Sequence, residues 1–168
     1  MPTRPPFLVS ATDVPETRHR YPNSDELMAP SRAIGRVAGL RRIGIHHVRV
    51  LPGTRTSWPH AESSEEEFVY VVRGEVDAWI DGELFRLKAG DLAAFPAGTG
   101  ISHTFLNDGE EEAILLVGGE TDKEENRIVY PLDPGRRSDL PPSRWWHDAP
   151  PRELGPHDGR PHRRPVSG

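Results

Sequence analysis

The chain has 168 residues, with 26 acidic side chains, 21 Lys or Arg side chains and a formal net charge of −5. This acidic balance argues against a general nucleic-acid-binding protein, because phosphate backbones are bound by basic surfaces. The absence of cysteine excludes disulfides and thiolate chemistry, so any metal must be bound by His, Asp or Glu. No stretch reaches about 18 consecutive apolar residues, and we expect a soluble cytoplasmic protein with no membrane partner.

The 18 prolines are unevenly distributed, and only Pro52, Pro59 and Pro96 fall between residues 31 and 130. Proline disfavours helix interiors and central strands, so the two ends cannot hold long regular elements. The remaining length suits one domain of about 100–150 residues. We therefore predict an N-terminal arm at 1–33, one folded domain at 34–130 and a Pro-rich tail at 131–168.

Between these arms, short β-branched or aromatic runs alternate with glycine turns, which is typical of an all-β domain. The pair Asp81-Gly82 is a hairpin signal. Many short strands at this spacing predict a sandwich or barrel. The predicted strands, in chain order, are Arg42–Leu51, Glu67–Val72, Glu75–Ile80, Leu84–Leu87, Leu92–Phe95, His103–Leu106, Ala113–Val117 and Arg127–Tyr130.

Two of these strands are apolar at consecutive positions, so both of their faces should be covered. One face fills the core. The other face needs a cover, which either a second subunit or the arms would provide. The apolar arm residues available for this are Phe7, Leu8, Trp145 and Trp146.

Two segments carry the side chains for a metal site. The first contains His60 and Glu62, which lie on one face if the backbone is extended. Glu67 opens the next apolar run, so its carboxylate can turn toward the same cavity. The second segment supplies another imidazole, His103. The predicted strand before Gly53 adds His46 and His47. Because side chains alternate along a strand, at most one of these two histidines faces into the barrel.

The spacing in these segments resembles the paired motifs of the cupin superfamily of small β-barrels. In the first motif the gap before Glu67 and the six-residue gap to Gly74 match. In the second motif the matching residues are Gly90, Pro96, His103 and Asn107. The sequence departs from the pattern at Glu62, which stands where the family usually has its second histidine. The Gly53-to-His60 gap is also one residue longer than usual, and the turn before His103 is two residues longer.

The resemblance covers roughly residues 40–120 and implies a double-stranded β-helix, the jelly-roll barrel of cupins. It also implies that His60, Glu62, Glu67 and His103 converge on one divalent metal ion. Mn²⁺, Fe²⁺, Zn²⁺ and Ni²⁺ all suit this mixed set of ligands. Homodimerisation is common among the proteins it resembles, and we expect it here.

These residues predict a metal-dependent enzyme that acts on a small oxygen-bearing organic molecule, in a dioxygenase, isomerase or decarboxylase type of reaction. No separate general base stands out from the sequence. The alternative is a non-catalytic barrel that binds or senses a small ligand, such as a sugar or a carboxylate. A barrel with a purely structural role is the third interpretation.

Overall fold

A computed structural model of the protein describes residues 3–121 and 123–163. The ends of both predicted arms, residues 1–2 and 164–168, and Asp122 lie outside the described residues. None of the described helices has the length and apolar character needed to cross a membrane. The elements are η1 (Ala11–Asp13), β1 (Ser31–Arg32), α1 (Ile34–Val37), β2 (Ile43–Val50), β3 (Ala61–Glu62), β4 (Glu67–Arg73), β5 (Glu75–Ile80), β6 (Glu83–Lys88), β7 (Leu92–Phe95), β8 (His103–Leu106), β9 (Ala113–Glu120), β10 (Ile128–Val129), η2 (Pro134–Asp139) and η3 (Pro142–Arg144).

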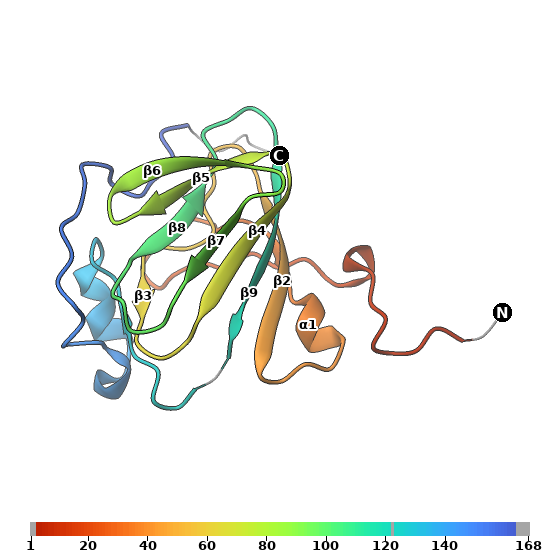
Figure 1. The fold of residues 1–168 in the computed structure, drawn as a ribbon, viewed down its shortest axis with the longest axis horizontal. Helices are drawn as coiled ribbons and strands as arrows, with labels where there is room; N and C mark the ends of the chain where they lie inside the picture. The colour runs from red at the N-terminus through yellow and green to blue at the C-terminus, as the bar shows by residue number, and fades with distance from the viewer. Residues whose placement is uncertain (1–2, 122, 164–168) are drawn as a thin grey trace.

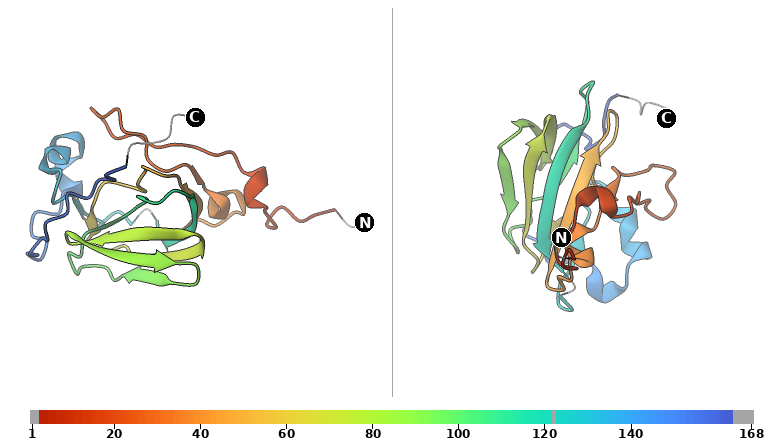
Figure 2. Two further views of the ribbon diagram at one scale, coloured as in Figure 1. Left: turned by 90° about the horizontal axis from the view of Figure 1, so that it is seen from above. Right: turned by 90° about the vertical axis from the view of Figure 1, so that its right-hand side faces the viewer.

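The strands form the all-β jelly-roll barrel that the sequence predicts (Figures 1 and 2). A five-stranded sheet has the order β1-β2-β9-β4-β7, and a three-stranded sheet has the order β6-β5-β8. Every pairing is antiparallel, and β2 and β9 pair along their full length, from Ile43↔Glu120 to Val50↔Ala113. The buried core contains residues of both sheets, namely Val48, Val50, Val69, Val71, Val76, Ala78, Phe95, Phe105, Ala113 and Leu115.

The predicted strands are confirmed to within three residues at every end, because each carries its own apolar pattern. The predicted hairpin is also present: Asp81 and Gly82 have φ angles of 47° and 91°, as a tight turn between β5 and β6 requires. The sequence missed β1, β3 and α1. The two strands have two residues each and α1 has four, so none shows a periodicity that could reveal it.

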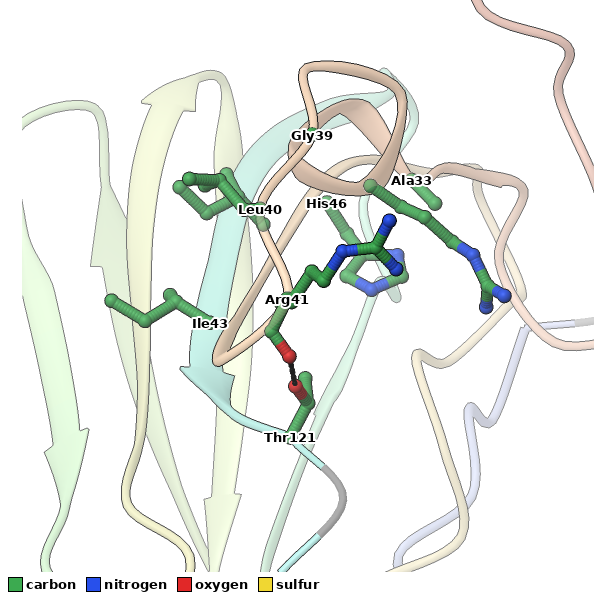
Figure 3. A pocket seen from close by; sticks show the side chains of 10 residues that line it. Ala33, Gly39, Leu40, Arg41, Ile43, His46 and Thr121 are labelled. Carbon is green, nitrogen blue, oxygen red and sulfur yellow. Dashed lines mark hydrogen bonds between the residues drawn. The ribbon is translucent and has the colours of Figure 1, made fainter.

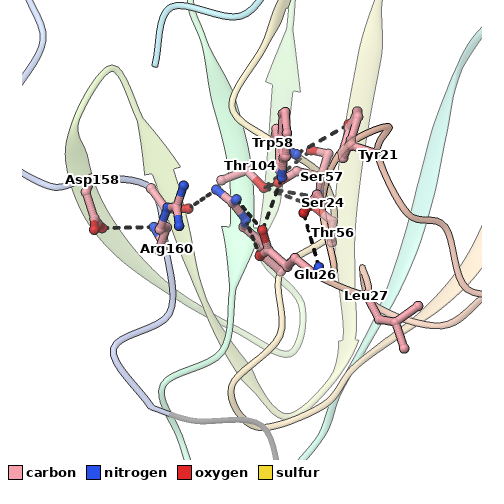
Figure 4. A network of polar contacts seen from close by, with 12 residues as sticks. Tyr21, Ser24, Glu26, Leu27, Thr56, Ser57, Trp58, Thr104, Asp158 and Arg160 are labelled. Atoms are coloured by element: carbon pink, nitrogen blue, oxygen red, sulfur yellow. Dashed lines mark hydrogen bonds and ion pairs between the residues drawn. The ribbon is translucent and has the colours of Figure 1, made fainter. Parts of the chain in front are cut away.

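Both arms are fastened to the barrel by one buried side chain, Arg55, which is 1% exposed. Its guanidinium donates two hydrogen bonds of 2.7 Å to the Glu26 carboxylate of the N-terminal arm. A third bond of 2.7 Å goes to the carbonyl of Gly159 in the C-terminal tail. Trp58 donates to the same Glu26 carboxylate at 3.1 Å and stacks on Tyr21 (Figure 4). Described parts of both arms therefore belong to the folded body.

The arms form a small core of their own, in which Tyr21, Met28 and Trp145 pack together with residues of β10. Trp146 is buried as well, whereas Phe7 and Leu8 are 66% and 53% exposed. The expectation that Phe7 and Leu8 cover an apolar surface is therefore wrong. The described residues also leave the outer face of β4 and β7 uncovered, and its exposed apolar residues are Tyr70, Val72 and Leu92.

Candidate metal site

Backbone pairing brings the two imidazoles together. His60, just before β3, forms an antiparallel bridge with His103 at the start of β8. Their backbones exchange hydrogen bonds of 3.3 and 3.0 Å. Residues directly opposite on antiparallel strands project from the same face with closely spaced Cβ atoms. Pairing therefore sets the two rings side by side, with centroids 5.1 Å apart.

Glu67 completes a cluster of three donors. Its Oε2 atom lies 3.0 Å from Nε2 of His103 and 3.5 Å from Nε2 of His60. Taking one ligand atom from each residue, all three atoms lie within 4.8 Å of one another. Phe95, the cross-strand partner of Glu67, stacks on the His103 ring at 3.5 Å and so restricts its orientation. The structure thus brings together three of the four residues that the sequence singled out.

The hydrogen bond of His60 to Trp58 bears on whether these residues fit a cation. Its Nδ1 atom lies 2.8 Å from the carbonyl oxygen of Trp58 and must be the donor, because a carbonyl only accepts. In the neutral ring Nε2 is then an unprotonated acceptor directed at the Glu67 carboxylate, itself an acceptor. Two facing lone pairs require a positive charge between them, which either a proton or a metal ion supplies.

The pKa values follow from the same arrangement. Burial alone would lower the pKa of His60, but the hydrogen bond and charge of Glu67 outweigh it and raise this pKa to about 9. Burial would raise the pKa of Glu67, yet hydrogen bonds from His103 and His60 hold it well below its usual range. Burial lowers the pKa of His103 despite the nearby Glu67 carboxylate. The site therefore favours an ionised carboxylate beside one cationic partner.

Glu62 lies beside this cluster and not within it. Its backbone pairs with Ile128 of β10, whereas His60 pairs with β8, so the two residues have different neighbours. Together with Glu65, Glu67 and His103, Glu62 lines a small opening. Burial and the charge of Glu67 raise the pKa of Glu62 to about 7. A role for Glu62 as a metal ligand remains a prediction.

The cluster faces a cavity of about 250 Å³ whose lining includes His46, His60, Glu67 and His103. Alternation along β2 allows at most one member of the His46-His47 pair to face the barrel, and His46 is the one that lines this cavity. Burial lowers the pKa of His46, against the opposing charge of Glu67. His19, from the N-terminal arm, also lines the cavity. The sequence analysis missed His19 because it lies in an irregular segment without a motif.

Comparisons with known proteins agree with this geometry. The cupin domain family matches residues 46–119. "Polyketide synthase CurC" of Streptomyces cyaneus is 33% identical over 111 residues, which are 66% of this chain and 67% of that protein. A sugar phosphate isomerase of the cupin superfamily from Silicibacter pomeroyi is 29% identical, with a TM-score of 0.67 over 73% of this chain and 80% of its own.

The polyketide cyclase RemF of Streptomyces resistomycificus shares the fold, with a TM-score of 0.60, 22% identity and coverage of 87% of this chain and 100% of its own. The curated relative, the matched domain and the similar folds point to one conclusion. The chain belongs to the cupin superfamily.

Proposed function

We propose that this protein is a metal-dependent enzyme whose reaction begins by removing a proton from a carbon atom next to a carbonyl group. The observation that carries the proposal is the cluster of His60, Glu67 and His103, with three ligand atoms within 4.8 Å at the wall of a cavity. The cavity volume of about 250 Å³ suits a small oxygen-bearing organic molecule.

His60, Glu67 and His103 would hold the ion, with Glu62 as an additional carboxylate at its edge. Two imidazoles with carboxylate oxygens suit Mn²⁺, Fe²⁺, Zn²⁺ or Ni²⁺. When bound, a divalent ion supplies positive charge that polarises a carbonyl oxygen. Phe95 stacks on His103 and the Trp58 carbonyl accepts from His60, so two of the ligands are held in orientation by their neighbours.

His46 is the proposed proton acceptor. It lines the same cavity, and burial keeps its pKa low enough for a neutral, proton-accepting ring near neutral pH. The proton passes from the substrate carbon to an imidazole nitrogen, and the electron pair of the C–H bond moves toward the carbonyl oxygen. The proton then returns to the former carbonyl carbon, and the hydroxyl proton moves from the neighbouring oxygen to the former carbonyl oxygen. A hydroxy ketone thereby becomes a hydroxy aldehyde without any external oxidant. The cupin relative named a sugar phosphate isomerase is consistent with this class.

Hydrogen exchange tests the proposal directly. Protein loaded with Zn²⁺ should exchange substrate C–H hydrogens with deuterated water, as followed by NMR on a panel of hydroxy ketones and hydroxy aldehydes. The variant His46→Gln should slow exchange by at least about 100-fold while it retains the metal. The exposed His147 provides a matched control, because His147→Gln leaves the cavity intact.

The absence of exchange with Zn²⁺, Mn²⁺, Fe²⁺ and Ni²⁺ alike would overturn the proposal. If small ligands bind in that case without turnover, the protein is a binding or sensor barrel. Oxygen consumption with Fe²⁺, or release of carbon dioxide, would indicate the dioxygenase or decarboxylase type of reaction instead.

We also propose that a second copy of the chain covers the open face of β4 and β7. Tyr70, Val72 and Leu92 are 39%, 51% and 60% exposed there, and the described parts of the arms leave them uncovered. Analytical ultracentrifugation should find a dimer, and Leu92→Lys should shift it toward monomer. A wild-type monomer at all concentrations would overturn this assembly.

A further inference from the structure

A second cavity, of about 410 Å³, adjoins the first one at His46, which lines both (Figure 3). Its wall is formed by α1, by the loop that follows α1, by the start of β2 and by Thr121 just after β9. The loop contributes Arg41, whose side chain extends toward the His46 imidazole in Figure 3. The metal cluster and this second cavity are thus connected through one side chain.

The lining of this second cavity is basic. The described residues that line it include Arg36, Arg41 and His46, and none of these described lining residues is Asp or Glu. Among residues 3–121 and 123–163, no carboxylate comes within 4.0 Å of the Arg36 or Arg41 guanidinium. By contrast, Arg49 and Arg86 each bind two carboxylates. Arg36 and Arg41 therefore carry charges that no described carboxylate neutralises, and an anion that enters the cavity is attracted to them.

The segment that carries the two arginines is anchored. Gly35 of α1 packs so closely on β2 that a Cβ atom there would lie 2.9 Å from the backbone nitrogen of Ile45. Leu40 closes the turn with a backbone hydrogen bond to Gly35. The Thr121 hydroxyl donates to the carbonyl of Arg41 at 3.0 Å. The backbone positions of Arg36 and Arg41 are therefore set by close packing and hydrogen bonds.

We propose that Arg36 and Arg41 form an anion pocket beside His46, which binds a phosphate ester or carboxylate group of the substrate. Guanidinium groups present paired N–H donors that match the oxygens of either group. The inference rests on the proposed function in one respect: the anion belongs to the same molecule whose carbonyl group lies near His60, Glu67 and His103. His46 then stands between the two ends of that molecule, where the reacting C–H group would lie.

Binding of inorganic phosphate to chelator-treated protein tests the anion pocket without any metal. Titration calorimetry should detect phosphate binding to the wild-type protein, and the double variant Arg36→Ala/Arg41→Ala should weaken it by at least about 10-fold. Arg42→Ala is the matched control, because Arg42 is an exposed neighbour that does not line the cavity. Acetate, titrated in parallel, distinguishes a pocket for carboxylates from one for phosphate esters.

Two outcomes would overturn the anion pocket. One is the absence of both phosphate and acetate binding. The other is an equal loss of binding in Arg42→Ala and the double variant, which would indicate general surface charge. If phosphate binds and the double variant loses it while no substrate is turned over, the anion pocket stands and the proposed function fails.

Where turnover is found, a hydroxy ketone and its phosphate ester form a matched pair of substrates. The double variant should raise KM for the ester by at least about 10-fold, with kcat within about twofold and the unphosphorylated ketone unaffected. Equal effects on both substrates would mean that the arginines act on the fold and not on the anion.

Discussion

Two buried groups of charged side chains in this protein behave in opposite ways. Around Arg55, the guanidinium nitrogens reach the Glu26 carboxylate and the Gly159 carbonyl, and each donor meets an acceptor at 2.7 Å. Around Glu67, the nearby Nε2 of a neutral His60 ring would be an acceptor facing an acceptor, and the contact is matched only when a proton or a metal ion lies between them. The first group is explained by the fold alone, whereas the second requires an added positive charge. A buried charged group therefore indicates a function here only where its neighbours in the protein do not supply matching hydrogen-bond donors and acceptors.

The largest expected effect is on metal content. Purified protein should carry about one divalent ion per chain, and His60→Ala or His103→Ala should weaken binding by at least about 100-fold, because each removes a direct ligand. Elemental analysis measures the content, and circular dichroism checks that the barrel remains folded. His147→Ala, at an exposed position, should change nothing. Wild-type protein that stays metal-free after reconstitution with Mn²⁺, Fe²⁺, Ni²⁺ and Zn²⁺ would contradict the metal site.

The contrasting effect at Arg55 is on stability. Arg55→Met should reduce the free energy of unfolding by about 3 kcal/mol, because it leaves Glu26 and the Gly159 carbonyl without their buried partner. Urea denaturation measures the loss. The control is Arg127→Met, which breaks an exposed ion pair with Asp148 and should cost at most about 1 kcal/mol. Equal losses in the two variants would mean that Arg55 does not fasten the arms.

The sequence predicted the strands well because each of them repeats an apolar pattern that depends only on its own residues. It also predicted the convergence of His60, Glu67 and His103, since spacing within two motifs determines which strand ends carry them. It could not predict the contacts of Arg55, whose partners lie 29 and 104 residues away in irregular arms. Such contacts depend on how the arms pack, and proline content says only that long helices and central strands are absent.

The position of Glu62 was hard to predict for a related reason. Alternation predicts that Glu62 and His60 share one face, but it does not give their pairing partners, and Glu62 pairs with β10 whereas His60 pairs with His103. Arg36 lies in α1 and Arg41 in the loop that follows it. With four residues, α1 is too short to show a helical pattern in the sequence. The positions of residues on long strands are therefore easier to predict from the sequence than the positions of residues in very short elements.

A change at Glu62, which lies beside the metal cluster, should have an effect of intermediate size on the metal preference of the site. Glu62→His should keep the metal and shift the preference of the site toward softer ions by about 10-fold, because an imidazole nitrogen replaces a carboxylate oxygen. Competition between Mn²⁺ and Zn²⁺ measures the shift. Glu65→Ala, at the same small opening, should leave both content and preference unchanged. Equal metal loss in both variants would show that Glu62 is only a neighbouring surface carboxylate.

The smallest effect concerns the pH dependence of stability at Glu26. Burial would raise the pKa of this carboxyl group, but the hydrogen bonds and charge of Arg55 outweigh it and hold the pKa below its ordinary value. A carboxyl group with a depressed pKa in the folded state stabilises the fold above its unfolded pKa of about 4.3, and this contribution disappears as the pH falls through the folded value. Glu26→Gln should therefore be less stable than wild type at pH 7, and the difference should shrink below about pH 4.

Denaturation at a series of pH values measures this difference in stability, and because both proteins retain Glu67, the difference isolates Glu26. A difference that stays constant across this range would mean that Glu26 acts through its shape and packing, so the fit between Arg55 and Glu26 would owe little to charge.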